Sequence, residues 1–311
     1  MSVLVFLEFN NNELKETSKQ ALTYANGINK NVYAISESKI SNDVVESLGK
    51  FGVSIYLINA VDFKENNILK CIIPTIEEFK INCIIFPKTN SFSYLSSILS
   101  TKLNFPLINN VNSVARFENK ICLKSTIFSG KAEADIEIDS NSCILVLNKN
   151  IINSASYKKS VIIKNLINKN DNSLSNNVVS LKKEKLEGDI LLNDADIVVS
   201  AGRGLKGPEN WKMIEKLAKI LNAGTACSKP VSDAGWRPHH EHVGQTGLKI
   251  SPNIYIAVGI SGAIQHLAGV NSSKIIVVIN NDSEAPFFKH ADYGIIGDAF
   301  DVIPKFIDAL K

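Results

Sequence analysis

The stretch Asp196–Trp211, DIVVSAGRGLKGPENW, decides the fold class of the second half of the chain. It opens with a short apolar, β-branched run, Asp196–Ala201, which is typical of a buried strand of a parallel sheet. Gly202–Gly207 then matches G-x-G-x-x-G, and Pro208 suits the first turn of a helix that we expect to run through Leu221. Strand, glycine turn and helix in this order predict an open α/β sheet.

The same alternation continues to the end of the chain. We expect strands at Thr225–Cys227, Ile254–Val258 and Ile275–Ile279, and helices at Ala263–Leu267 and Ala299–Leu310. These elements predict a second domain, residues 189–311, built as an open, mostly parallel, Rossmann-like sheet with flanking helices.

Residues 1–188 predict a first α/β domain. Strands and helices alternate up to Pro106, with strands expected at Val3–Phe9, Val32–Ile35, Val53–Ile58 and Cys83–Phe86, and helices at Glu13–Ile28, Asp43–Phe51, Ile68–Phe79 (with a break allowed at Pro74) and Tyr94–Leu103. Four strand candidates then follow without helices: Val111–Phe117, Ile121–Phe128, Ala132–Ile138 and Cys143–Leu147. Their close spacing predicts an antiparallel extension of this domain.

The end of the first domain carries little regular pattern. Lys164–Asn177 is polar, rich in Asn and without a period, which favours a linker or a long surface connection. Val161–Ile163 and Val178–Leu181 are candidate edge strands.

Length and composition limit the class of protein. The 311 residues suggest two domains, and 45% apolar with 21% charged residues is typical of a globular chain. The net charge of +3 does not point to nucleic acid. Five scattered cysteines favour reduced thiols in a cytoplasm. No apolar run approaches the ~20 residues of a membrane span, and Met1–Phe9 resembles a first strand rather than a leader.

Two glycine turns are the strongest candidate binding features. In the first, Arg203 adds a forked charge suited to phosphate or carboxylate. The second lies in Tyr255–His266, where Ser261, Gly262 and the following free N–H groups can cradle an anion. Two such turns on one sheet suit a dinucleotide. An acidic ribose ligand is absent where the next strand ends in Cys227–Pro230, which argues against a plain NAD-linked dehydrogenase.

Other polar residues gather in the same half of the chain. Val243–Gly247, VGQTG, places an amide and a hydroxyl between two glycines, which suits the edge of a flat ring such as a flavin. Lys229 follows Ser228 at a strand end that faces the same crevice. His266 is expected to face a ligand. The HHEH run at residues 239–242 predicts a solvated loop rather than a metal site.

Several long motifs, in order between Ser200 and Asp298, resemble the alpha subunit of electron transfer flavoprotein. They are SAGRGLKGPENW, CSKPVSDAGW, VGQTG, YIAVGISGAIQHLAG and VVINNDSEAPFFKHADYGIIGD. The resemblance implies a heterodimer with a smaller beta subunit, whose interface is expected on the N-terminal domain, residues 1–188. It also implies one FAD held in extended form by the C-terminal domain. It also implies an electron carrier without catalytic residues, supplied by flavin dehydrogenases such as the acyl-CoA dehydrogenases of fatty acid beta-oxidation, and delivering to a quinone-linked or other acceptor.

The resemblance also implies residue roles. Arg203 would lie near the flavin or phosphate side, Ser228 and Lys229 at the isoalloxazine ring, and Gln245 and Thr246 around the flavin and ribityl region, with Thr246 near N5. Ser261 through His266 would lie at the pyrophosphate, with His266 reaching the pyrimidine edge. Asn280 and Asp298 would contact the adenosine half. The full implied set is Arg203, Gly204, Ser228, Lys229, Val243, Gly244, Gln245, Thr246, Gly259, Ser261, Gly262, Ala263, Ile264, Gln265, His266, Asn280 and Asp298.

Two positions depart from the family. Lys229 stands where Arg is common, which keeps the charge and loses the planar fork. His242 stands where Gln is common, and a titrating neighbour there would add pH dependence to the flavin potential.

Other functions remain open on the sequence. One alternative is an NAD(P)-linked dehydrogenase or a transhydrogenase-like enzyme. Another is an electron-bifurcating member of the same family, which needs a second FAD in the beta subunit.

Overall fold

The computed structural model describes residues 2–10, 13–29, 31–36, 40–58, 65–128, 132–166, 192 and 195–310. The chain divides into two compact units, residues 1–183 and 184–311. The predicted boundary between residues 188 and 189, the candidate strand Val178–Leu181 and most of the Asn-rich segment lie outside the described residues.

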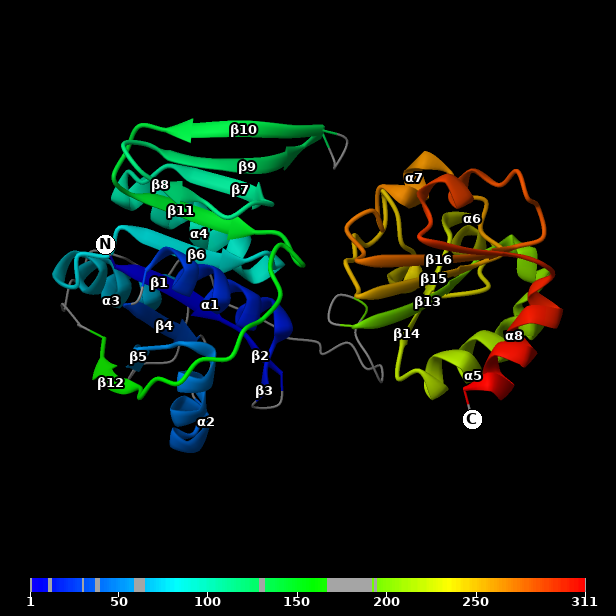
Figure 1. Cartoon of the computed structure of the whole chain (residues 1–311), viewed down its shortest axis with the longest axis horizontal. Coiled ribbons are helices and arrows are strands. Elements are labelled where there is room, and N and C mark those ends of the chain that lie inside the picture. The colour runs from blue at the N-terminus through cyan, green and yellow to red at the C-terminus, as the bar shows by residue number, and fades with distance from the viewer. Residues whose placement is uncertain are drawn as a thin grey trace. The chain divides into compact units, whose positions relative to one another are not determined.

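The first unit is a mixed sheet covered by helices on both faces (Figure 1). Its main strand order is β10-β9-β7-β11-β6-β1-β4-β5-β12. The strands are β1 (Val3–Leu7), β4 (Val32–Ser36), β5 (Ile55–Ile58), β6 (Cys83–Pro87), β7 (Leu107–Val111), β8 (Arg116–Phe117), β9 (Ile121–Ile127), β10 (Ala132–Ile138), β11 (Cys143–Leu147) and β12 (Ile162–Asn165), with a small separate pair β2 (Phe9–Asn10) and β3 (Glu13–Leu14). The helices are α1 (Glu16–Ile28), α2 (Asn42–Ser47), which continues into the 3-10 turn η1 (Leu48–Phe51), α3 (Glu65–Glu78) and α4 (Asn90–Leu103).

Two hydrophobic cores lie on the two faces of this sheet. Alternate residues of β1 enter each core, because neighbouring side chains of a strand point to opposite faces. Val3 and Val5 pack with α1, whereas Leu4 and Phe6 pack with α3 and α4. Helix α3 continues across Pro74, so the break allowed there does not occur. Proline removes one backbone hydrogen bond of the helix. The neighbouring Ile72 and Ile76 are buried in the core, and this packing holds the helix on both sides of Pro74.

The predicted antiparallel extension is only partly correct. Strand β9 pairs antiparallel with β10, β8 and β7. Strand β11, however, is parallel to β6 and β7 and lies between them. The strand predicted at Val111–Phe117 is also wrong, since β7 ends at Val111 and β8 begins at Arg116. All five residues of β11 are buried, as expected for a central strand covered on both faces.

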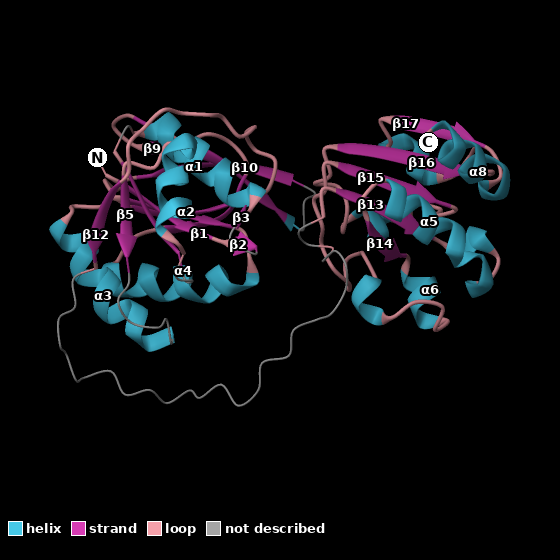
Figure 2. Cartoon of the chain, turned by 90° about the horizontal axis from the view of Figure 1, so that it is seen from below, coloured by secondary structure: helices cyan, strands magenta, loops and turns pink. Residues whose placement is uncertain are grey.

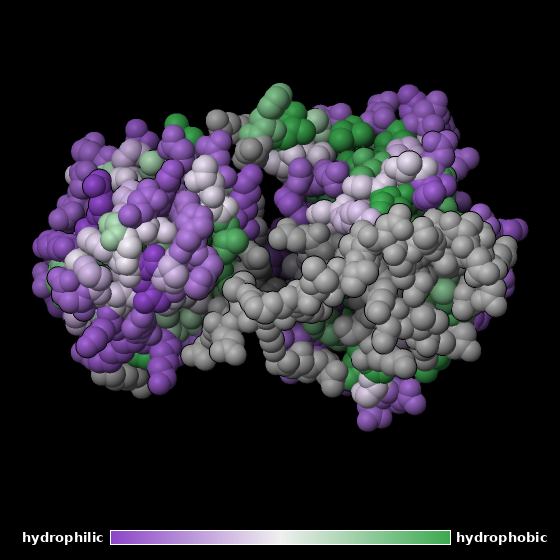
Figure 3. All heavy atoms as spheres, turned by 180° about the vertical axis from the view of Figure 1, so that it is seen from behind, coloured by the Kyte–Doolittle hydropathy of each residue, from purple (hydrophilic) through white to green (hydrophobic). Residues whose placement is uncertain are grey.

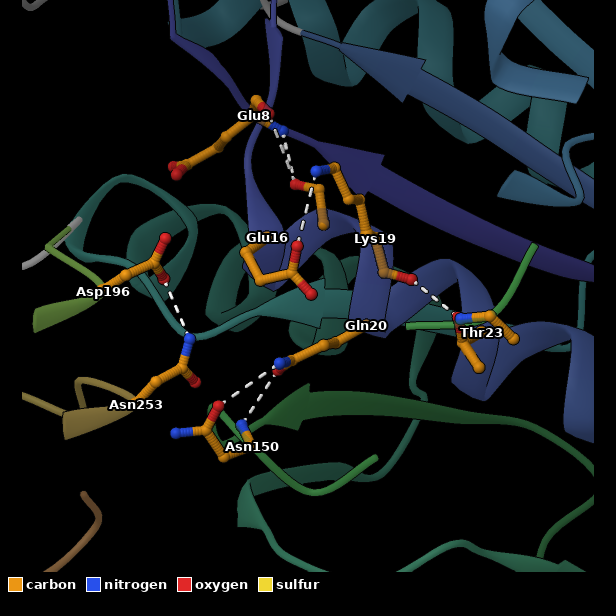
Figure 4. A network of polar contacts seen from close by, with 10 residues as sticks. Glu8, Glu16, Lys19, Gln20, Thr23, Asn150, Asp196 and Asn253 are labelled. Carbon is orange, nitrogen blue, oxygen red and sulfur yellow. Dashed lines mark hydrogen bonds and ion pairs between the residues drawn. The ribbon is translucent and has the colours of Figure 1, made fainter. Parts of the chain in front are cut away.

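Side-chain amides fasten the segment after β11 to α1 (Figure 4). The Asn150 backbone N–H donates to Gln20 Oε1 at 2.9 Å, and Gln20 Nε2 donates to Asn150 Oδ1 at 3.3 Å. One turn further along α1, Thr23 Oγ1 accepts from the Ala155 backbone N–H at 3.0 Å. These bonds hold the segment between β11 and the edge strand β12 against α1. Strand β12, Ile162–Asn165, lies close to the edge strand predicted at Val161–Ile163.

The second unit is a five-stranded parallel sheet in the order β14-β13-β15-β16-β17 (Figure 2). Its elements are β13 (Ile197–Ala201), η3 (Arg203–Leu205), η4 (Pro208–Trp211), α5 (Lys212–Ile220), β14 (Gly224–Cys227), α6 (Lys229–Asp233), η5 (His239–Glu241), β15 (Ile254–Val258), α7 (Ile264–Leu267), β16 (Ile275–Asn280), η6 (Pro286–His290), β17 (Tyr293–Ile296) and α8 (Ala299–Ala309). The chain leaves β13 toward β14 on one side and returns to β15 on the other. The sheet therefore has a topological switch point between β13 and β15.

Helices cover both faces of the second sheet as well. Helices α5 and α8 pack on one face through Ile214, Leu217 and Ile303, and α7 covers the other face through Leu267. One 3-10 turn, Arg203–Leu205, lies within the glycine loop. The helix expected from Pro208 begins with a second one, Pro208–Trp211, and α5 starts only at Lys212. The glycine loop therefore does not run directly into an α-helix.

No helix in the described parts of the chain is both long and apolar enough to cross a membrane. Hydrophobic side chains nevertheless reach the surface at several places (Figure 3). Phe128, at the end of β9, is 75% exposed, and Tyr293 and Ile296 on the edge strand β17 are 65% and 67% exposed.

Candidate cofactor site at the carboxyl ends of the second sheet

Two glycine turns meet at the switch point of the second sheet. The Gly202 N–H donates to the Val258 carbonyl at 2.9 Å, and the Gly204 N–H donates to the Gly259 carbonyl at 3.1 Å. A Cβ built on Gly204 would lie 2.7 Å from Gly259 Cα, closer than side chains allow. Gly259 itself has φ +59°, a left-handed conformation that glycine adopts readily. Glycine at both positions therefore lets the two turns pack backbone against backbone. They lie at the switch point, which is where open α/β sheets bind ligands.

The VGQTG turn lies next to them at the end of β14. The Val243 N–H donates to the Cys227 carbonyl at 3.1 Å, which holds the turn to the strand end. The Gln245 N–H donates to the Gln265 carbonyl at 2.7 Å, which joins the turn to the start of α7. The side chains of Gln245 and Thr246 are exposed. An amide and a hydroxyl are thus exposed on a turn whose backbone is held at both ends.

The turn after β15 is also shaped by a required glycine. Gly262 has φ +84°, and a Cβ there would collide with Phe287. The Phe287 N–H donates to the Ser261 carbonyl at 3.1 Å, while the Ser261 side chain remains exposed. Helix α7 has only four residues, so the expected anion cradle is a short turn rather than the start of a long helix.

The predicted binding residues lie at one edge of the sheet. Arg203 and Gly204 follow β13, Ser228 and Lys229 follow β14, and Ser261 follows β15 in sequence; the further predicted residues at this edge are Val243, Gly244, Gln245, Thr246, Gly259, Gly262, Ala263, Ile264, Gln265 and His266. The side chains of Arg203 and Lys229 are exposed and bring positive charge to this edge, whereas Ser228 is buried.

Two predicted residues have structural partners. Asn280, the last residue of β16, is 9% exposed, and its Nδ2 donates to the Ile260 carbonyl at 3.0 Å. Asp298 follows β17 and caps α8 by accepting from the Phe300 N–H at 3.0 Å. That bond, with Lys206 Nζ at 3.5 Å, lowers the pKa of the Asp298 carboxyl. Both side chains thus hold the local backbone in place.

His266, which the sequence predicts to face a ligand, is buried. It is 7% exposed, and a hydrogen bond of 2.8 Å links its Nε2 to the Tyr255 hydroxyl. Burial, followed by the nearby His242, lowers its pKa to about 4. The ring is therefore neutral near pH 7. Phe287 packs edge-on against it, with ring centroids 5.9 Å apart.

The expectation of a solvated HHEH loop is wrong for Glu241 and His242, which are 8% and 2% exposed. His239 and His240 are exposed, but His242 is 2% exposed and its Nδ1 has no hydrogen-bond partner among the described residues. Burial is the first cause that lowers its pKa, and the nearby His239 is the second. Glycines on both sides of Gln245 and Thr246 leave room for this ring beneath the turn.

Arg237 is a structural residue of this region that the sequence reasoning missed. Its Nε donates to Glu241 Oε2 and its Nη1 to Glu215 Oε1, both at 2.8 Å. Its guanidinium also lies 5.4 Å from the centre of the Trp211 ring. This clamp joins the segment before His242 to α5. The spacing of four residues between Arg237 and Glu241 was the sequence feature that could have predicted their ion pair.

The site fits a dinucleotide-type cofactor. It combines two closely packed glycine turns at a switch point with exposed hydroxyl and amide groups. Nearby, the Nδ1 atoms of His242 and His266 are buried and have no hydrogen-bond partner in the described part of the chain. Among the described residues, no group of three His, Cys, Asp or Glu side chains could hold a metal ion. The fold and site thus define a two-unit α/β protein with a nucleotide-cofactor domain at its C-terminal end.

Comparisons with known proteins identify the family. Residues 191–271 match the model of the electron transfer flavoprotein FAD-binding domain, and residues 3–167 match the electron transfer flavoprotein domain. The electron transfer flavoprotein subunit alpha of Syntrophomonas wolfei subsp. wolfei is 31% identical, covering 99% of this chain and 98% of that one. The subunit alpha of Pseudomonas aeruginosa is 30% identical over 98% of each, and that of Bacillus subtilis is 35% identical over 76% of this chain and 73% of its own.

The chain therefore belongs to the electron transfer flavoprotein alpha-subunit family. This confirms the resemblance seen in the motifs, and the matched FAD-binding domain makes FAD its cofactor.

Proposed function

We propose that this chain is the alpha subunit of a cytoplasmic heterodimer that carries electrons on one FAD. The beta subunit of electron transfer flavoprotein is its partner. Electrons come from flavin dehydrogenases, such as acyl-CoA dehydrogenases, and pass to a quinone-linked or other acceptor. The observation that carries this proposal is the contact of the Gly204 and Gly259 turns at the switch point, beside exposed Gln245 and Thr246.

Each turn of the site binds a different part of FAD. Glycine lets the turns at Gly204 and Gly259–Gly262 pack closely together. Their backbone N–H groups bind the phosphates, because the free N–H groups of such turns attract anions. Gln245 and Thr246 hydrogen-bond the flavin end, with Thr246 near N5. Asn280 and Asp298 keep the turns at the adenosine end in place through the Ile260 and Phe300 backbone.

Positive charge at this edge favours the reduced cofactor. When bound, FAD supplies a flavin ring that accepts and releases electrons. Lys229 and Arg203 are exposed and positively charged, so they stabilise negative charge gained in their neighbourhood. Lys229 offers a point charge rather than the planar fork of arginine, so it fixes a ring edge less rigidly.

Exposed apolar side chains support a protein partner. Strand β17 lies at the edge of its sheet, and all four of its residues are exposed, Tyr293, Ile295 and Ile296 among them. Unpaired strand edges with apolar side chains are typical of surfaces that contact another chain.

The test is co-expression of this chain with the beta-type subunit of the same genome. We expect one yellow complex with one copy of each chain, measured by light scattering after gel filtration. Catalytic amounts of an acyl-CoA dehydrogenase with its acyl-CoA should then bleach the flavin spectrum. As a control, the acyl-CoA alone should leave the spectrum unchanged. A chain that remains single, or a complex that the dehydrogenase cannot reduce, would contradict the proposal.

A further inference from the structure

His242 lies beneath the turn that presents Gln245 and Thr246. A Cβ built on Gly247 would lie 2.8 Å from His242 Nδ1, and one built on Gly244 would lie 3.4 Å from His242 Nε2. The His242 ring therefore packs against both glycines of this turn. The ring is 2% exposed, and Nδ1 has no hydrogen-bond partner among the described residues. A buried polar nitrogen without a partner costs free energy, so its retention needs an explanation.

A second histidine, His266, also lies beside Gly244. The Cβ of a residue at Gly244 would also lie 3.6 Å from His266 Cα. His266 is fixed by the hydrogen bond to Tyr255, and the bond from the Gln245 N–H to the Gln265 carbonyl holds its backbone against the turn. A charge on either imidazole disfavours a charge on the other. The two rings thus accept one proton far more readily than two.

The charged and titratable groups around His242 come from every neighbouring element. His239 of η5 lies with its ring centroid 5.5 Å away, and Lys229 and Asp233 come from α6. Cys227 of β14 pairs with His242 through the backbone, and burial raises the pKa of its thiol to about 12, so it stays protonated. Of these groups only Asp233 favours a charged His242, whereas His239 and Lys229 oppose it.

The pair is therefore neutral before reduction and can respond to added negative charge. Burial and the cationic neighbours lower the pKa of His242, and burial lowers that of His266. Negative charge gained in the crevice has the opposite effect, because an anion nearby favours the protonated imidazole. In a site shielded from water this attraction is stronger than at the surface.

We propose that His242, coupled to His266, takes up a proton from solvent when the FAD carried by this chain is reduced. This inference rests on the proposed function, because it needs FAD at the Gly244–Gly247 turn. One electron arrives from a reduced flavoprotein or from dithionite, and one proton leaves water and forms an N–H bond on His242. The positive charge gained by the imidazole balances the negative charge gained by the cofactor. His242 thus acts on the cofactor only through its charge. Transfer of the proton from water to the ring is the only change of covalent bonds on this chain.

The experiment is a spectroelectrochemical titration of the FAD-loaded complex between pH 5.5 and 8.5. One proton per electron changes the reduction equilibrium tenfold per pH unit, which is 59 mV for a one-electron step. We expect the midpoint potential of the wild type to fall with pH toward that slope, and His242→Gln to have a shallower slope. His240→Gln is the matched control, because it makes the same change at an exposed histidine two residues away, and it should keep the wild-type slope.

A second readout does not depend on the variant. The wild-type complex is assembled with [15N]histidine in this chain only, which has five histidines, of which His242 and His266 are the buried ones. On reduction with dithionite at pH 7, one buried ring should move from neutral imidazole to imidazolium nitrogen shifts. Two buried rings that remain neutral, or equal slopes in the wild type and His242→Gln, would overturn the proposal.

Failure of this inference can be told from failure of the proposed function. A complex without FAD shows no flavin absorbance before any potential is measured, and that result refutes the proposed function. A yellow complex with equal slopes refutes only the role of His242.

Discussion

Acid should lower the free energy of unfolding of the second unit, because His266 is buried in its neutral form. The imidazole is almost fully buried, and burial lowers its pKa from 6.5 to about 4. The unfolded chain binds the proton more readily, so this contribution to stability is complete above pH 6.5 and is lost as the pH falls toward 4. The whole shift corresponds to about 3 kcal/mol, of which about 2 kcal/mol is lost between pH 7 and pH 5.

Tryptophan fluorescence makes this measurement specific. Trp211 and Trp236 are the two tryptophans of the chain, and both lie in the second unit. Trp211 is 3% exposed, and Trp236 packs against the same core, so both report unfolding of that unit. Urea unfolding of the cofactor-free chain, followed at several pH values, gives the free energy of unfolding.

Two variants separate His266 from the other titrating groups. His266→Gln should remove about 2 kcal/mol of the pH dependence between pH 7 and 5, because glutamine does not titrate. His290→Gln changes an exposed histidine and should leave the pH dependence intact. The reasoning is refuted if His266→Gln keeps the same loss of stability between pH 7 and pH 5 as the wild type.

Three further changes test the packing of the site by the same unfolding assay. Gly259→Ala should lower the free energy of unfolding and weaken FAD binding, because the new Cβ would lie 2.9 Å from Gly204 Cα. Gly235→Ala is the control: Gly235 has φ +72° and no atom within 4 Å of the added Cβ, so the change should cost only the ~1 kcal/mol of a left-handed backbone. Equal losses in these two variants would refute the close contact. Arg237→Lys should cost about 1 to 2 kcal/mol, since lysine cannot hold two glutamates with one planar group, and an unchanged urea midpoint would argue against the clamp. Asp298→Ala should lower the midpoint while Asp298→Asn keeps it, since asparagine also caps helices, and a loss in both would show that the cap is not the reason.

Regular buried strands were predictable from the sequence. β13, β15 and β16 are β-branched runs between glycine or polar residues, and they lie close to their predicted bounds. β17 was missed because its apolar run is only four residues long and is interrupted by Gly294. The parallel direction of β11 was missed because it depends on pairing with β6, some 60 positions earlier, and not on local pattern.

The candidate site was predictable where backbone geometry defines it. Glycines mark tight turns, so the sequence pointed to the Gly202–Gly207 and Gly259–Gly262 loops that meet at the switch point. Burial in loops was not predictable in the same way. His242 follows two exposed histidines, and no period indicates that the chain turns its ring inward beneath the glycine turn.

Hydrogen–deuterium exchange is the most direct test of the central claim that FAD lies at the carboxyl ends of β13, β14 and β15. The measurement compares the FAD-loaded complex with the same complex stripped of its cofactor, and follows exchange by mass spectrometry. We predict slower exchange with FAD in peptides that cover residues 202–207, 243–247 and 259–266. Unchanged exchange in all three peptides, with protection appearing elsewhere, would contradict the account.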